Sequence, residues 1–343
     1  MTKLSGYRAT VPLTGIHKAE YVYTKSQSFS ERLPGEGLFC CLRNDASIIL
    51  HQKICVHCAP KEFSFLYTFG VHLVYYNKPL STKGVRVTNI VAIASQKGGV
   101  GKTSLTQNLS AELARAGKQV LVVDFDPQSN LTSGWGLDPV VERPTIYTAM
   151  LSPERVRTCI IHHRPGVDMI PANLDLAGAE LQFLAAVDRN TKLKKALQPL
   201  RGAYDYILID GPPSLGFFTV NALVAADEIF IPLQCQVYAY KAIDQLLDII
   251  QQVQEINSTL RLSAVVLTMY DARNSLTTSV EDSARRRFGD LVTQTVIPVN
   301  VRVAEAPLDG VSVGEYEPTS KGAEAYRQLA QEVIARGTKK ART

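Results

Sequence analysis

The chain has 343 residues, of which 45% are hydrophobic and 20% are charged; this balance is typical of globular proteins and excludes wholesale disorder, collagen and coiled coil. No apolar run approaches the roughly 20 residues of a membrane-spanning helix, and the N-terminus lacks the basic patch, apolar core and cleavage site of a secretory signal. We therefore expect a soluble, cytoplasmic protein.

The net charge of +5 is distributed unevenly along the chain. Residues 1–87 hold 11 Lys and Arg against 5 Asp and Glu, whereas the other residues hold 26 against 27. A pI near 8.8 would by itself suggest a nucleic-acid partner. Because the excess charge belongs to the first quarter of the chain, a basic surface on the main body has to come from local clustering.

Residues 1–85 are expected to be an N-terminal extension of unknown fold, because they show no sustained periodicity. They contain four of the six cysteines, Cys40, Cys41, Cys55 and Cys58. With His51 these could form a zinc site, although adjacent cysteines rarely bind one tetrahedral ion; ordinary thiols are the alternative. A third hypothesis is that the segment is disordered or not translated. Because no Met lies between Met1 and Met150, a start after the segment would need a non-Met start codon, such as one read as Val85 or Val87. A peptide from residues 20–70 of the native protein would exclude lack of translation.

Residues 86–337 show short apolar runs that alternate with helical patterns, followed by a basic tail at 338–343. The apolar runs are Ile90–Ala94, Gln119–Val123, Val167–Ile170, Tyr206–Ile209, Glu228–Pro232, Leu262–Leu267 and Leu291–Ile297. The clearest helical patterns are Lys102–Ala116, Tyr238–Ile256, Thr277–Phe288 and Lys321–Ala335. This alternation predicts one α/β domain with a mostly parallel, doubly wound sheet. His162 and His163, ahead of Pro165-Gly166, are expected in a surface loop.

The strongest motif is Gln96-Lys97-Gly98-Gly99-Val100-Gly101-Lys102-Thr103, which follows a predicted strand and opens a predicted helix. This context is typical of a phosphate-binding loop, in which glycines let backbone N–H groups surround phosphate oxygens at a helix N-terminus. Such a loop predicts that Lys102 reaches the β- and γ-phosphates and that the Thr103 hydroxyl binds Mg²⁺. The nucleotide-binding set predicted here runs from Lys97 to Ser104, and the predicted cofactors are ATP and Mg²⁺.

The loop departs from the common pattern, because Gln96 stands where the first glycine is usual and a second lysine, Lys97, enters it. KGGVGKT resembles the deviant Walker A loop of the ParA/MinD class of P-loop ATPases. The resemblance implies that Lys97 reaches the nucleotide of a second subunit in an ATP-bound sandwich dimer. There it would act like an arginine finger on the transferred phosphoryl group.

Two aspartate-containing segments follow predicted strands, where an open α/β sheet places its ligand. Asp124-Phe125-Asp126-Pro127-Gln128 resembles the first switch of this class, and Asp210-Gly211-Pro212-Pro213-Ser214 resembles the second. The resemblance implies that Asp126 positions the attacking water. It also implies that Asp124 and Asp210 support Mg²⁺.

Further segments resemble the Soj-type ParA chromosome or plasmid partitioning ATPases over about residues 88–336. They include Pro232-Leu233-Gln234-Cys235, Val265–Arg273, Val296–Pro307 and Ser320–Tyr326. The resemblance implies an ATP-dependent homodimer that binds double-stranded DNA without sequence preference, on the nucleoid, and is released when a ParB-type partner stimulates hydrolysis. It carries the DNA contacts onto Arg273 and Arg302. Arg286, in the run Arg285-Arg286-Arg287, is a further candidate, with a solvated helix face as the alternative. At Val299, where many members have Arg, this sequence departs from the pattern.

Met269, Pro298 and Asn300 are expected beside the adenine by the same resemblance, with core and loop packing as the alternative.

Three other classes of ATPase are alternatives. A MinD-like membrane ATPase would need an amphipathic C-terminal helix, and the basic tail lacks large apolar residues, so no stable membrane association is expected. A nitrogenase-like protein would need paired cluster cysteines, whereas the domain holds only Cys159 and Cys235. A cargo-positioning relative would share the DNA step and differ in its partner.

Overall fold

The computed structural model describes residues 86–141, 143–236 and 239–340, together with the backbone of six short strands near the N-terminus. The backbone divides into two units, Met1–Thr82 and Lys83–Thr343, which are described separately. In the first unit four antiparallel strands form a sheet in the order β1-β2-β3-β4, and β5 pairs with β6. Their bounds are β1 (Arg8–Thr10), β2 (Glu20–Thr24), β3 (Ser28–Arg32), β4 (Phe39–Leu42), β5 (Cys58–Ala59) and β6 (Glu62–Phe63). The side chains of the hypothetical zinc site lie outside the described residues.

The second unit is built on a seven-stranded sheet in the order β13-β12-β7-β11-β8-β10-β9. Its strands are β7 (Asn89–Ile93), β8 (Val120–Asp124), β9 (Ile161–Arg164), β10 (Val167–Ile170), β11 (Tyr206–Asp210), β12 (Glu228–Gln234) and β13 (Arg261–Thr268). All neighbours pair in parallel except the edge strand β9, which is antiparallel to β10. The chain order of the central strands leaves β7 in the middle, so the loop after it lies at a reversal of strand order, where such sheets bind ligands.

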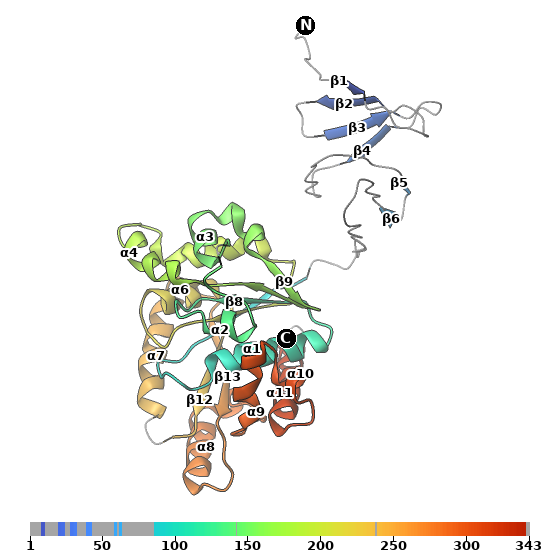
Figure 1. Cartoon of the computed structure of the whole chain (residues 1–343). Coiled ribbons are helices and arrows are strands. Elements are labelled where there is room, and N and C mark those ends of the chain that lie inside the picture. The colour runs from blue at the N-terminus through green and yellow to red at the C-terminus, as the bar shows by residue number, and fades with distance from the viewer. Residues whose placement is uncertain are drawn as a thin grey trace. The chain divides into compact units, whose positions relative to one another are not determined.

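Helices cover both faces of this sheet, as predicted (Figure 1). The α-helices are α1 (Lys102–Arg115), α2 (Asn130–Gly134), α3 (Ile146–Leu151), α4 (Ala179–Phe183), α5 (Lys192–Leu197), α6 (Phe217–Ala225), α7 (Ala239–Gln254), α8 (Ser275–Phe288), α9 (Val301–Glu305), α10 (Val313–Tyr316) and α11 (Lys321–Lys340). Short 3-10 helices are η1 (Pro153–Cys159), η2 (Leu174–Gly178), η3 (Arg189–Thr191), η4 (Gln198–Leu200), η5 (Gly289–Leu291) and η6 (Ala306–Asp309).

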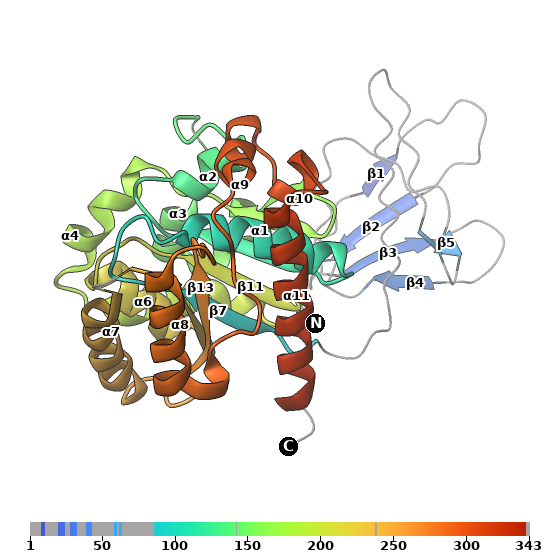
Figure 2. The ribbon, with the colours of Figure 1, turned by 90° about the horizontal axis from the view of Figure 1, so that it is seen from below.

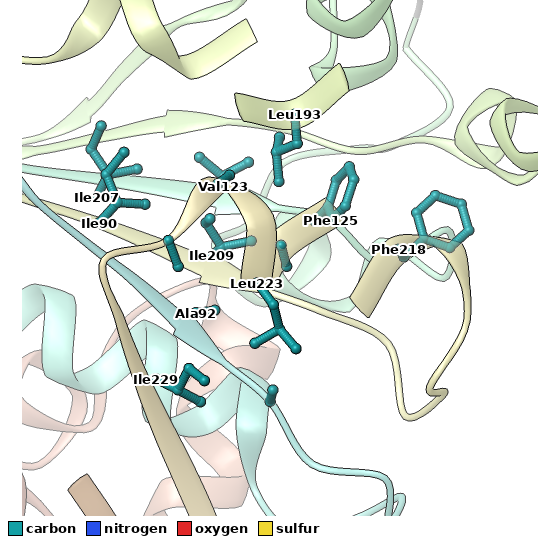
Figure 3. Close-up of a cluster of buried hydrophobic side chains, with 14 of the residues drawn as sticks. Ile90, Ala92, Val123, Phe125, Leu193, Ile207, Ile209, Phe218, Leu223 and Ile229 are labelled. Carbon is teal, nitrogen blue, oxygen red and sulfur yellow. The ribbon is translucent and has the colours of Figure 1, made fainter. Parts of the chain in front are cut away.

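Two hydrophobic cores hold the layers together. On one face, alternate strand residues pack against α3, α5, α6, α7 and α8. Figure 3 shows part of this core, in which Ile207 lies beside Ile90 and Ile209 lies near Leu223 of α6. On the other face, the intervening strand residues pack against α1, α10 and α11, which lie side by side in Figure 2. Near-continuous apolar strands are what a parallel sheet covered on both faces requires.

The expected strand at Leu291–Ile297 is wrong. Only isolated bridges form there, from Val292 to Val265 and from Pro298 to Tyr270. The reason is a competing acceptor, because the Glu332 carboxylate of α11 accepts the backbone N–H groups of Gln294 (2.9 Å) and Thr295 (3.0 Å). These amides are therefore not available to a β-ladder.

The expectation that His162 and His163 lie in a loop is also wrong, because both belong to β9. Gly166, with φ +81°, closes a hairpin that returns β9 antiparallel to β10. Among the described residues, α11 is longer than its sequence pattern indicated and continues to Lys340. No helix in the described ranges is long and apolar enough to cross a membrane.

Glu332→Ala should lower the free energy of unfolding by about 2–3 kcal/mol, because two backbone amides and the Arg336 guanidinium lose their acceptor. Urea denaturation measures this loss. Gln331→Ala, at the exposed neighbouring position, is the control. A loss below about 0.5 kcal/mol, the level of an ordinary surface substitution, would contradict the role given to Glu332.

Candidate functional site

The phosphate loop connects the carboxyl end of β7 to α1. Gly99 and Gly101 adopt left-handed backbone conformations, with φ +71° and +88°, which residues with a Cβ rarely adopt. Gly101 is also the N-cap of α1 and supplies no side-chain cap. The first N–H groups of a 14-residue helix therefore open onto the loop, and this is the usual geometry of a phosphate site.

Lys102 is buried at the start of α1, with 7% of its surface exposed. Burial lowers the pKa of its ammonium group, while the negative charges of Asp210 and Asp126 act in the opposite direction. The side chain is thus shielded from solvent and lies within the electrostatic influence of two carboxylates. A phosphate bound at the loop would share this lysine.

Asp124 ends β8 and is completely buried. Thr132 donates to its Oδ2 from both the backbone N–H (2.8 Å) and the hydroxyl (2.7 Å), and the Asp126 N–H donates to Oδ1 (3.2 Å). Burial nevertheless raises the pKa of Asp124 to about 6. Asp126 lies in the next turn, where its Oδ1 accepts the N–H of Gln128 (2.9 Å).

Asp210 ends β11 and stands directly opposite Asp124 in the strand register. The Phe125 N–H donates to the Asp210 carbonyl (2.8 Å), and the Thr106 hydroxyl of α1 donates to the Asp210 carboxylate (3.3 Å). Burial, followed by the charge of Asp124, raises the pKa of Asp210 to about 7, although Thr103 and Lys102 oppose the shift. Two buried carboxylates therefore meet beside the phosphate loop with too little positive charge around them.

This donor set fits Mg²⁺ bound to a nucleotide. Magnesium prefers hydroxyl, carboxylate and water oxygens and usually retains waters and phosphate ligands, so a cage made of protein side chains alone is not needed. In the described ranges no three His, Cys, Asp or Glu side chains form such a cage. Two buried polar atoms at this edge, Gln96 Oε1 and Ser129 Oγ, lack a hydrogen-bond partner. That finding fits a site completed by a ligand.

Lys97, the second lysine of the loop, points toward β12. Its Nζ donates to Gln234 Oε1 (3.0 Å) and to Gln236 Oε1 (2.5 Å). It is only partly buried. The two lysines of the loop therefore have different surroundings: Lys102 faces buried carboxylates, and Lys97 faces neutral amides.

The three residues expected beside adenine lie on two joined segments. The bridge between Tyr270 and Pro298 connects the segment after β13 to the segment before α9. Met269 is 39% exposed and has φ +50°, and the neighbouring Thr268 hydroxyl donates to the Val100 carbonyl of the phosphate loop (2.9 Å). Asn300 caps α9 by accepting the N–H of Arg302 (2.9 Å).

The arginines expected to contact DNA occupy two places. Arg273 and Arg302 follow the segments joined by the Tyr270–Pro298 bridge, and their side chains are 91% and 51% exposed. Each is paired with a carboxylate, Arg273 with Asp271 (2.9 Å) and Arg302 with Glu305 (2.7 Å). Arg286 lies near the far end of α8, about 16 Å along the helix from Ser275, so it does not belong to the same cluster.

Several site residues were missed from the sequence. Thr132 orients Asp124, Thr106 contacts Asp210, and Gln234 and Gln236 hold Lys97. Thr106 lies four residues after Lys102 on one helix face, a spacing that could have indicated it. Gln234 and Gln236 could have been noted because they follow the carboxyl end of a strand. The remaining cysteines, Cys159 and Cys235, are buried and free.

A glycine loop between a central parallel strand and a helix, with a buried lysine and two register-paired aspartates, defines a P-loop nucleotide-binding protein. A family model described as an AAA domain matches residues 88–262. The sporulation initiation inhibitor protein Soj of Bacillus subtilis is 45% identical over 250 residues, which cover 72% of this chain and 99% of that protein. The chromosome partitioning protein ParA of Caulobacter vibrioides is 45% identical over 251 residues, covering 72% and 94%.

Among solved structures, cobyrinic acid a,c-diamide synthase from Mycobacterium smegmatis with bound ATP analogue and magnesium is similar, with a TM-score of 0.65 and 37% identity over 72% of this chain and 94% of that one. The identity and coverage of the curated relatives are decisive. The chain belongs to the Soj/ParA family of chromosome-partitioning ATPases, and the resemblance inferred from its motifs is confirmed.

Asp210→Asn should change how the stability of the nucleotide-free protein depends on pH. The folded pKa of about 7 lies above the ordinary value of 3.8, so the folded state binds more protons between these values. The free energy of unfolding of the unsubstituted protein therefore falls as pH rises from about 4 to about 7. Asn cannot ionise, so the variant lacks this pH dependence. At pH 8 its free energy of unfolding should therefore exceed that of the unsubstituted protein by about 1 kcal/mol or more.

Urea denaturation between pH 5 and pH 8, without nucleotide or Mg²⁺, tests this prediction. Asp290→Asn, at an exposed position, is the matched control and should leave the pH profile unchanged. An Asp210→Asn profile parallel to that of the unsubstituted protein would show that Asp210 does not take up the proton.

Proposed function

We propose that the protein is a DNA-segregation ATPase that binds ATP with Mg²⁺ and hydrolyses it to ADP and phosphate. The ATP-bound form is a sandwich homodimer that binds double-stranded DNA without sequence preference. A ParB-type partner stimulates hydrolysis, which separates the dimer and releases the DNA. The protein acts in the cytoplasm, on the nucleoid, without stable membrane association.

The observation that carries this proposal is the difference in burial and in partner charge between the two lysines of the phosphate loop. Lys102 is buried against Asp210 and Asp126, so it serves the phosphates of its own subunit. Lys97 is partly exposed and bound to neutral side chains, so it remains free to serve another nucleotide. A loop that carries a second, releasable cation is suited to a site completed by a second subunit.

For hydrolysis, the residues of this chain position groups and charges. The α1 N-terminus and Lys102 would hold the phosphates, and Thr103, Asp124 and Asp210 would hold the metal directly or through water. Mg²⁺, when bound, would neutralise charge on the β- and γ-phosphate oxygens. Asp126 follows the buried Asp124 in a turn fixed by its own bond to Gln128. From this turn Asp126 would orient water at the γ-phosphate.

For DNA binding, Arg273 and Arg302 offer two exposed guanidinium groups on joined segments. Non-specific binding needs phosphate contacts alone, and each contact releases counterions. The pairing with Asp271 and Glu305 has to be broken or shared when phosphate binds. Arg286, at the other end of α8, would extend the contact along the DNA.

A second candidate function is a MinD-like or cargo-positioning ATPase that acts on a membrane or protein assembly. The observation that favours it is the exposure of Val299 (64%) and Val301 (67%) directly beside Arg302. Exposed valines suit an apolar partner better than a phosphate backbone. DNA binding with and without ATP separates the DNA-segregation ATPase from a membrane ATPase. A cargo-positioning ATPase shares the DNA step and is separated by the identity of its partner.

Arg302→Ala and Arg273→Ala should each weaken binding to random-sequence duplex DNA to a similar extent for all sequences. Each should also flatten the dependence of log K on log salt by roughly one unit if one phosphate contact is lost. Fluorescence anisotropy over a salt series, with ATP, with ADP and without nucleotide, measures this. Arg155→Ala, at an exposed position of η1, is the control. A loss of affinity for some DNA sequences only, or DNA binding that does not depend on ATP, would contradict the proposal.

Asp126→Asn should trap the ATP-bound dimer with little turnover. Asn retains an oxygen that can accept the Gln128 N–H but loses the charge that orients water. Phosphate release and light scattering measure turnover and dimerisation on the same sample. Normal turnover in the variant would show that another group positions the water.

A further inference from the structure

Lys97 is held within its own subunit by two glutamines to which the sequence motifs assign no role. Its Nζ donates to Gln234 Oε1 at 3.0 Å and to Gln236 Oε1 at 2.5 Å. Both glutamines follow or end β12, the strand beside β7, from which the phosphate loop emerges. The lysine therefore lies along the carboxyl edge of its own sheet.

The orientation of Gln234 is fixed from its other end. Its Nε2 donates to the Met269 Sδ at 3.0 Å, so its Oε1 faces Lys97. Met269 is itself held in a left-handed conformation after β13. The adjoining Thr268 hydroxyl holds the Val100 carbonyl of the phosphate loop (2.9 Å). The ends of β12 and β13 and the phosphate loop thus form one bonded unit around Lys97.

We infer that Gln234 and Gln236 are positioning residues for Lys97, which retain its ammonium group in cis until a second subunit offers a nucleotide. The inference rests on the proposed function for one point, that Lys97 binds the nucleotide of a second subunit. The contact of Lys97 with the two glutamines is a property of the single subunit. Release exchanges two amide oxygens for phosphate oxygens. The strength of the hydrogen bonds from Lys97 to Gln234 and Gln236 therefore sets the protein concentration at which the dimer forms.

The neutral character of the two acceptors decides the strength of this hold. An ammonium group bonded to amide oxygens makes charge-assisted bonds without a partner charge. Because Lys97 and Gln236 are accessible to solvent, water competes for both. A carboxylate at position 236 would turn the contact into an ion pair and strengthen it, whereas an apolar side chain of similar length would remove one acceptor. Gln236→Glu and Gln236→Met should therefore act in opposite directions.

The first experiment tests retention in the nucleotide-free protein. Reductive methylation with formaldehyde and a borane, followed by peptide mass spectrometry, gives the reaction rate of the Lys97 amine. Gln236→Met should raise this rate by about threefold or more, since one bond that occupies the amine is lost, and Gln236→Glu should lower it. Equal rates in the three proteins would overturn the retention whether or not the protein forms dimers.

The second experiment tests the consequence for dimerisation. Analytical ultracentrifugation with ATP and Mg²⁺ gives the protein concentration at the midpoint of dimer formation. Gln236→Met should lower this midpoint by about three- to tenfold and Gln236→Glu should raise it, on the scale of one charge-assisted bond shared with water. ATP affinity measured at concentrations below dimer formation should not change. A purely structural role would move both midpoints in the same direction.

Gln252→Glu and Gln252→Met, at an exposed position near the end of α7, control for the change in charge and polarity. Both should behave like the unsubstituted protein in the two experiments. Midpoint shifts of the same sign, or midpoints equal to that of a dimerising unsubstituted protein, would overturn the inference alone. If the unsubstituted protein stays monomeric with ATP, the proposed function fails, and the role in dimerisation fails with it.

Discussion

The burial of two register-paired carboxylates is the constraint on which the rest of the site depends. Asp124 and Asp210 end adjacent parallel strands, so the sheet itself brings them together. Removal from water raises the pKa of each, and Lys102 balances this charge only in part. Two buried carboxylates side by side are electrostatically unfavourable by themselves, and a bound cation with its phosphates would offset their charge. The two carboxylates remain close together because apolar residues on both faces of the sheet fix both strands.

Helix α1 connects this site by buried hydrogen bonds to α2 and to the segments around α10. Gln107 donates to the carbonyls of Gly134 (2.6 Å), after the Asp126 turn, and Val311 (3.1 Å), after η6. Asn108 accepts the N–H of Val313 at the start of α10 (2.7 Å). These buried bonds connect the helix that starts at the phosphate loop with the segments that flank α9, where Arg302 lies.

The sequence predicted what short-range patterns determine. The phosphate loop, the helix after it and the aspartates at strand ends depend on residues within a few positions of one another, and the structure has them in place. The expected strand at Leu291–Ile297 was wrong because Glu332, far along the chain, takes the amides of Gln294 and Thr295. Strand β9 was missed because its partner is a hairpin neighbour at the sheet edge, with mixed burial and no apolar run. The acceptors of Lys97 lie 137 and 139 residues away, beyond the reach of any local pattern.

The two lysines of the loop show how burial and partner charge give one motif two different environments. Lys102 is enclosed and faces formal negative charge, so moving it would leave buried carboxylates without compensation, at a cost of several kcal/mol. Lys97 is partly exposed and its partners are neutral, so its departure would leave behind only amides that water can reach. The same ammonium chemistry is therefore permanent at one position and exchangeable at the other. This asymmetry is what a site completed by a second subunit requires: one cation that keeps the nucleotide and one that can leave its own subunit.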